Sequence, residues 1–227
     1  MMKKVLILAA HPDDEVLGCG GILSKYQGSG VEFKIVFIGE GSSCRYTELD
    51  SKESKDAINF RNACAIKALD SLGVQNFVFH NLPCGRFDQI PIIEINKIIE
   101  KEITSFSPDT LFTHSVFDAN NDHKIVFHST IMATRPGAKN SVSKLYSFEV
   151  LSSSEWNFQS PFVANYFESL SEQDVENKWK ALEIYESETK EFPFPRSRLG
   201  IKTQSMSRGM QAGCSFAEAF YLVRELK

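Results

Sequence analysis

The sequence predicts an α/β fold, a Rossmann-like three-layer sandwich with a mostly parallel sheet and a C-terminal elaboration. Short apolar runs alternate with segments of helical period through the first two thirds of the 227 residues. Such compact strand–helix–strand repetition is typical of a parallel sheet that helices cover on both faces. The length favours one domain over 1–227, with the core at 1–150 and the strands and helices of 151–227 packed on it.

Each element of the first two thirds has a local signal. The predicted strands are short apolar runs at 5–9, 33–38, 77–80 and 110–113. The predicted helices have apolar residues at helical spacing and lie at 14–26, 54–72, 92–105 and 122–134. Gly73 is a natural end for the second helix, and Pro108 breaks the chain before the fourth strand. The polar stretch at 39–50 has no clear period and is expected to be a loop.

The last third has a different organisation. Strands are expected at 144–150 and 165–168 and a helix at 175–189, followed by a Pro-broken stretch at 192–195. The alanine-rich segment 217–224 is predicted to end a helical tail. Because ligands of open parallel sheets bind outside the carboxyl ends of the strands, the site is expected in the first two thirds.

Composition excludes several classes of function. A net charge of -4 argues against charge-driven binding to nucleic acid or anionic lipid. The five cysteines are odd in number and form no Cys-x-x-Cys pair, which disfavours a disulfide framework and a thiolate zinc site. The apolar run after Lys4 stops within six residues, too short for a signal peptide or a membrane span. We therefore expect a cytoplasmic protein; whether copies of the chain assemble is left open.

The strongest chemical motif directly follows the first strand and reads Ala-His-Pro-Asp-Asp-Glu at 10–15. Crowded carboxylates beside an imidazole are costly without a cation. His11 and Asp14, three residues apart across a strand-to-helix turn, can point at one divalent ion, and Asp13 between them could deprotonate a water. The alternative is that Asp13 and Asp14 only cap the helix that follows.

A second cluster follows the strand at 110–113 and therefore opens on the same edge of the sheet. It spans 114–123 and contains His114, Asp118, Asp122 and His123. Catalytic zinc commonly has three protein ligands, and His123 would complete a set with His11 and Asp14. Asp122 is expected to orient a ligand, and His128 is expected to be a partly buried structural histidine.

These two motifs resemble those of the LmbE-like or PIG-L de-N-acetylases, zinc enzymes that remove acetyl groups from N-acetylglucosamine-type sugars. Two further segments resemble the family, around Arg61 and at 208–220. The resemblance implies one divalent ion, zinc, held by His11, Asp14 and His123, with Asp13 as general base. It implies a small N-acetylated sugar as substrate and a sugar contact for Arg61, whose alternative is a surface salt bridge.

One position departs from the resemblance. The family often has His-x-Asp-His in the second motif, whereas this chain has Asn120 at the first position. Asn120 can donate a hydrogen bond to an oxyanion but cannot deliver a proton. Asp13 is therefore expected to carry out both proton transfers, with His114 or Asp118 as substitutes. Arg45, in the loop at 39–50, and His114 are expected at the substrate.

Two other functions remain as alternatives, and a third is disfavoured. The same site could cleave a larger amide, such as a thiol–sugar conjugate. The departure at Asn120 also allows a non-catalytic sugar-binding protein on the same scaffold. Dinucleotide binding is disfavoured, because no Gly-x-Gly-x-x-Gly follows the first strand.

Overall fold

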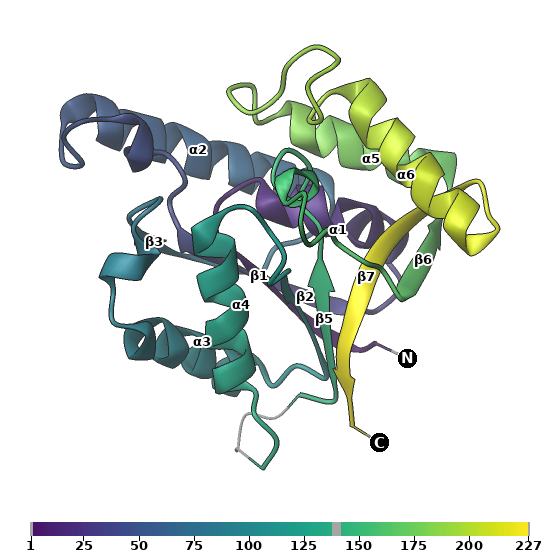
Figure 1. The fold of residues 1–227 in the computed structure, drawn as a ribbon, viewed down its shortest axis with the longest axis horizontal. Helices are drawn as coiled ribbons and strands as arrows, with labels where there is room; N and C mark the ends of the chain where they lie inside the picture. The colour runs from purple at the N-terminus through teal and green to yellow at the C-terminus, as the bar shows by residue number, and fades with distance from the viewer. Residues whose placement is uncertain (1, 138–141, 227) are drawn as a thin grey trace.

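The computed structural model describes residues 2–137 and 142–226 and contains a seven-stranded sheet (Figure 1). The strand order is β3-β2-β1-β4-β5-β7-β6. The strands are β1 (Lys4–Ala9), β2 (Glu32–Gly39), β3 (Phe77–Leu82), β4 (Thr110–His114), β5 (Lys144–Phe148), β6 (Tyr166–Leu170) and β7 (Phe216–Glu225). Strands β1 to β5 are parallel, and β7 is antiparallel to both of its neighbours, β5 and β6. The predicted α/β class with a mostly parallel sheet is confirmed.

Helices cover both faces of the sheet (Figure 1). One face carries α1 (Asp14–Lys25), α2 (Lys52–Ser71), α5 (Glu172–Glu183) and α6 (Arg198–Ala212). The other carries α3 (Ile92–Phe106) and α4 (Asn121–Ala133). The alternation of β1 separates the two cores, because Val5 and Ile7 join the first and Leu6 and Leu8 join the second.

The helices diverge at the carboxyl ends of β1 and β4. These strands are neighbours, but α1 after β1 and α4 after β4 lie on opposite faces of the sheet. Such a switch point is the usual ligand-binding place in an open α/β sheet. His11 lies just after β1, and His114 is the last residue of β4. Both side chains are buried at this place.

The segment 217–224 is the main correction to the sequence-based prediction. It belongs to β7, and the helix α6 precedes it. Four consecutive residues of β7, at 217–220, are buried, so the strand lacks the alternation that would distinguish it from a helix. The carboxylate of Glu218, buried among them, accepts the amide hydrogens of Gly21 and Ile22 and pairs with Lys178.

The bounds of helix α5 also differ from the predicted range 175–189. Helix α5 begins at Glu172 rather than 175, because Ser171 and Asp174 form a capping box. It ends at Glu183, and the chain beyond it no longer continues the helix. Tyr185 contacts Glu15 of the first motif, and Glu188 pairs with Arg61. The expectation that His128 is partly buried was wrong, because this side chain is exposed on α4.

The pairing of β7 with β5 supports our proposal that residues 1–227 form one domain. Across the described ranges, every helix is too short or too polar to span a bilayer.

Candidate metal centre

The turn after β1 places the first motif at the carboxyl end of this strand. Asp13 has a φ of 116°, a backbone conformation that is rare for a residue with a side chain. The backbone amide of His11 donates to Asp14 Oδ2 at 2.8 Å, and that of Asp13 donates to Glu15 Oε2 at 2.9 Å. The carboxylates of Asp14 and Glu15 thus stabilise the turn of the motif through its backbone amides. This turn brings the side chains of Asp13 and Asp14 to one edge of the sheet.

Three side chains able to bind a metal converge there. The ligand atoms of His11, Asp14 and His123 all lie within 4.8 Å of one another, and all three residues are buried. Asp14 Oδ2 lies 3.3 Å from Nε2 of His123 and 3.6 Å from Nδ1 of His11. Burial opposes the charge on Asp14, but His123 and His114 hold the pKa of this carboxyl well below its usual range. The three predicted ligands therefore lie together around an ionised carboxylate.

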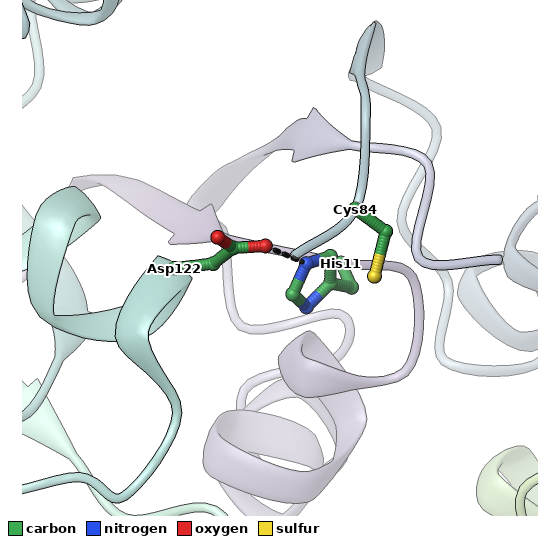
Figure 2. Close-up of side chains that lie close together, drawn as sticks. All are labelled: His11, Cys84 and Asp122. Atoms are coloured by element: carbon green, nitrogen blue, oxygen red, sulfur yellow. Dashed lines mark hydrogen bonds and ion pairs between the residues drawn. The ribbon is translucent and has the colours of Figure 1, made fainter. Parts of the chain in front are cut away.

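His11 also belongs to a second group, with Cys84 and Asp122 (Figure 2). Nε2 of His11 lies 2.9 Å from Asp122 Oδ2. The same carboxylate accepts the backbone amides of Gly85 at 2.6 Å and Phe87 at 3.2 Å. Because these donors already occupy Asp122, it is suited to orient the His11 ring, and Nδ1 of His11 faces Asp14.

Asp13 lies beside this cluster and is held by two arginines. Its Oδ2 accepts from Arg61 Nη2 at 2.9 Å and from Arg196 Nη1 at 2.6 Å. Its Oδ1 is buried and has no hydrogen-bond partner among the described residues. Burial raises the pKa of Asp13, although Arg196 and Arg61 oppose the rise. One oxygen is thus fixed, and the other is left to accept a proton.

Arg61 is buried, so the alternative of a surface salt bridge was wrong. Its side chain donates to the carbonyls of Pro12 and Gly41 as well as to Asp13, and pairs with Glu188 at 3.0 Å. With these donors occupied by protein groups, Arg61 is placed to position Asp13. Arg45 is half-exposed and donates to Glu188 at 2.8 Å, which puts it nearer the solvent than Arg61.

The position of His114 favours packing over the expected contact with substrate. The side chain is fully buried, and its ring stacks on His123 with centroids 4.0 Å apart. Its Nε2 accepts the backbone amide of Ala10 at 2.8 Å. Burial lowers the pKa of His114 to about 3, with help from His123. His114 is therefore neutral at physiological pH and has no exposed surface.

Asp118 is likewise unsuited to supply a proton. Burial alone would raise its pKa, but His123, with Nδ1 3.2 Å from Asp118 Oδ1, and the hydroxyl of Ser153 lower it to about 2. The carboxylate also accepts from Ser154 Oγ at 2.8 Å. Both substitutes that the sequence suggested are thus in the wrong protonation state to act as a general acid near pH 7.

Asn120 has a structural role of its own. It is the N-cap of α4, and its side-chain oxygen accepts the backbone amide of Asp122 at 2.9 Å. Its backbone amide donates to Asp118 Oδ1 at 2.8 Å. The NH2 group of the side chain is the part that could donate to an oxyanion. The cap fixes the start of the helix that carries Asp122 and His123.

The residues fit a divalent metal ion. Two imidazole nitrogens and one carboxylate oxygen form a donor set that zinc accepts. Asp14 and Asp118 raise the pKa of His123 to about 10 against the effect of burial, which indicates that the carboxylates favour a cation at this point. Asp122 supplies the acceptor that a metal-binding imidazole usually has on its other nitrogen.

Sequence reasoning missed Arg196, Glu188 and Tyr185, and it gave Glu15 of the first motif no role of its own. Tyr185 donates to Glu15 Oε1, and burial raises the pKa of Glu15 to about 8. Glu188 links Arg45, Arg61 and Arg196. Arg196 directly follows the Pro-broken stretch, and its positive charge was the one local signal for a role near a carboxylate. The sequence could not show which carboxylate it meets, because 183 residues separate it from Asp13.

Comparison with known proteins identifies related chains. Residues 6–134 match the sequence model of the PIG-L family, described as GlcNAc-PI de-N-acetylase. The Escherichia coli protein described as uncharacterized deacetylase YaiS is 27% identical over 187 residues, which cover 82% of this chain and 91% of the relative.

Solved structures share the fold. The N,N'-diacetylchitobiose deacetylase from Pyrococcus horikoshii has a TM-score of 0.79 and 21% identity, covering 98% of this chain and 84% of its own. The 4-carboxy-2-hydroxymuconate hydratase GalB from Pseudomonas putida has a TM-score of 0.77 and 20% identity, covering 100% and 98%. Since a hydratase and a deacetylase both have this fold, the reaction has to be argued from the site.

Proposed function

The chain belongs to the PIG-L family of de-N-acetylases, and on this basis we propose that it hydrolyses the amide of an N-acetylated amino sugar to acetate and a free amine. The observation that carries the proposal is the position of Asp13 beside the cluster of His11, Asp14 and His123. Its Oδ1 has no hydrogen-bond partner among residues 2–137 and 142–226. The curated relative from Escherichia coli, described as a deacetylase, supports the same reaction class.

His11, Asp14 and His123 would hold one divalent ion, with zinc as the expected metal. When bound, such an ion lowers the pKa of water and polarises a carbonyl group. Asp122 orients the His11 ring through the contact at Nε2. The site is buried, which keeps bulk water from competing for these groups.

The oxygen of the attacking water bonds to the carbonyl carbon of the acetyl group, and Asp13 Oδ1 accepts the proton that this water loses. Arg61 and Arg196 hold Oδ2 in place. The tetrahedral carbon then collapses, the C–N bond breaks, and Asp13 returns the proton to the leaving nitrogen. One carboxylate can act as base and then as acid because it regains its proton within the cycle. The protonation states of His114 and Asp118 leave Asp13 as the best-placed proton donor. The NH2 group of Asn120 would donate to the oxyanion.

A mass-spectrometric screen of N-acetylated sugars with the zinc-loaded protein tests the proposal. We expect loss of one acetyl group from a soluble glucosamine derivative, and no turnover by Asp13→Asn with its metal content unchanged. Full activity of Asp13→Asn with metal retained would exclude Asp13 as the base. Cleavage of a larger amide only would favour a thiol-conjugate amidase, and tight sugar binding without turnover would favour a binding protein. A cytoplasmic location remains our prediction.

A further inference from the structure

Two cysteines from different loops meet beside the candidate metal centre. Cys44 lies in the short helix η1 (Ser43–Arg45) after β2, and Cys84 follows β3. Their Sγ atoms are 3.2 Å apart, although 40 residues separate them in the chain, and both thiols are free. We propose that Cys44 and Cys84 form a reversible disulfide when a small peroxide from solution reaches Cys44, and that this modification disturbs the neighbouring site.

The buried carboxylate of Glu40 holds the two loops together. Its Oε1 accepts the backbone amide of Cys84 at 2.8 Å, and its Oε2 accepts those of Ser42 and Ser43 at 2.5 Å and 2.9 Å. A disulfide needs an S–S distance of about 2.05 Å, so the sulfurs have only to close by roughly an ångström. The loops are already fixed against each other, and the reaction requires no refolding of either one.

The exposure of the two thiols gives each a different role. Cys44 is exposed, whereas Cys84 is 7% exposed, so a small peroxide meets Cys44 first. The Cys44 thiolate attacks one peroxide oxygen, the O–O bond breaks, and Cys44 becomes a sulfenic acid while the other oxygen leaves as water or alcohol after protonation. The Cys84 sulfur then attacks the Cys44 sulfur. The S–O bond breaks, and hydroxide leaves with the Cys84 proton as water. Two electrons pass from the thiol pair to the peroxide.

The pair is connected to the site through the turn after Cys84. The next residue, Gly85, donates its backbone amide to Asp122 Oδ2 at 2.6 Å, and the same oxygen lies 2.9 Å from Nε2 of His11. The sulfur of Cys84 lies within 4.8 Å of ligand atoms of both His11 and Asp122. Figure 2 shows these three side chains close together. Drawing Cys84 toward Cys44 therefore moves the turn that holds Asp122 against His11.

The other three cysteines lack such an arrangement. Cys19 and Cys64 are buried in the first core cluster, and Cys214 directs its thiol to the carbonyl oxygen of Phe216. Cys214 is half-buried and lies between α6 and β7. It provides a matched control for non-specific oxidation.

The test begins with the folded, zinc-loaded full chain and a stepwise addition of hydrogen peroxide. After the free thiols are alkylated, the protein is digested without reduction and its peptides are mapped by mass spectrometry. We expect a Cys44–Cys84 cross-link that dithiothreitol reverses, its absence in Cys44→Ser, and wild-type behaviour in Cys214→Ser. Accumulation of a sulfinic acid or a peroxide-insensitive thiol at Cys44, with Cys84 unlinked, would overturn the proposal.

The effect on the site is measured on the same samples. The activity and zinc readouts rest on the proposed function, whereas peptide mapping does not, so failure of either proposal can be distinguished. We expect cross-linked protein to lose zinc to a chelator faster and to turn over more slowly, both restored by dithiothreitol. A cross-link that leaves zinc release and turnover unchanged would exclude the connection to His11.

Discussion

The guanidinium group of Arg196 lies 2.6 Å from Oδ2 of Asp13, although the two residues are 183 positions apart. Arg196 follows the Pro-broken stretch and is itself fixed by donation to Leu151 O at 3.1 Å and to Ser152 Oγ at 2.5 Å. The C-terminal part of the chain therefore completes the surroundings of the residue that we propose as general base.

Replacing Arg196 by Met should impair proton transfer at Asp13. The variant removes a charge-assisted hydrogen bond worth roughly 1.5–3 kcal/mol, so we expect about a 10- to 100-fold lower kcat. Loss of the positive charge raises the pKa of Asp13, so the acidic limb of the pH–rate profile should move to higher pH. Arg198→Met is the control. Arg198 is an exposed arginine at the start of α6, and it pairs with Glu176 of α5. An unchanged pH profile would contradict a positioning role for Arg196.

Replacing His123 by Ala should weaken metal binding. If His123 is a ligand, the variant should lose more affinity than the roughly 10- to 100-fold typical of an outer partner. Zinc content after purification, together with competition against a chelator, measures the loss. His128→Ala is a matched control, because His128 is exposed on the same helix. Wild-type zinc affinity in His123→Ala would remove His123 from the ligand set.

Replacing Asp122 by Asn tests the orientation of His11. The variant keeps the size of the side chain but loses the charge that accepts from Nε2 of His11. We expect zinc affinity to fall by about 10- to 100-fold while the protein stays folded. Asp88→Asn, at an exposed position of the neighbouring turn, should bind zinc as the wild type does. Equal affinities for the two variants would show that Asp122 does not support the ligand.

The stability of the fold should depend on Glu188 in a defined pH range. Burial opposes its charge, but Arg45 and Arg61 lower the pKa of Glu188 from its ordinary 4.5 to about 2. A carboxyl whose pKa is lower in the folded state stabilises it above the unfolded pKa, and this stabilisation is lost as pH falls through the folded pKa. The lower pKa of Glu188 corresponds to a contribution of at most about 3 kcal/mol to the free energy of unfolding.

Glu188→Gln should therefore unfold more easily than the wild type at pH 7, and the difference should shrink between about pH 4.5 and pH 2. Denaturant unfolding at several pH values measures this difference. Glu191→Gln removes an exposed carboxylate three residues away and is the control. A difference that stays constant across this pH range would rule out the electrostatic explanation.

The strands and helices of the first two thirds could be predicted from the sequence, because the patterns that indicate them are local. The apolar run of β1 and the polar turn after it lie next to each other in the sequence, and the helical spacing of the apolar residues in 92–105 predicts the helix α3. Segment 217–224 could not be assigned in this way. A strand covered on both faces has no alternation, and only its pairing with β5 and β6 shows its conformation.

The sequence by itself determined which residues could form the site. His11, Asp13 and Asp14 follow one strand and Asp122 and His123 follow another, and carboxyl ends of parallel strands meet at one edge. Tertiary structure alone decided their partners: Arg61 and Arg196 on Asp13, Glu188 among the arginines, and Cys84 beside Cys44. These contacts join segments tens to hundreds of residues apart, and no local pattern specifies which of many charged or thiol side chains will meet once the sheet has folded.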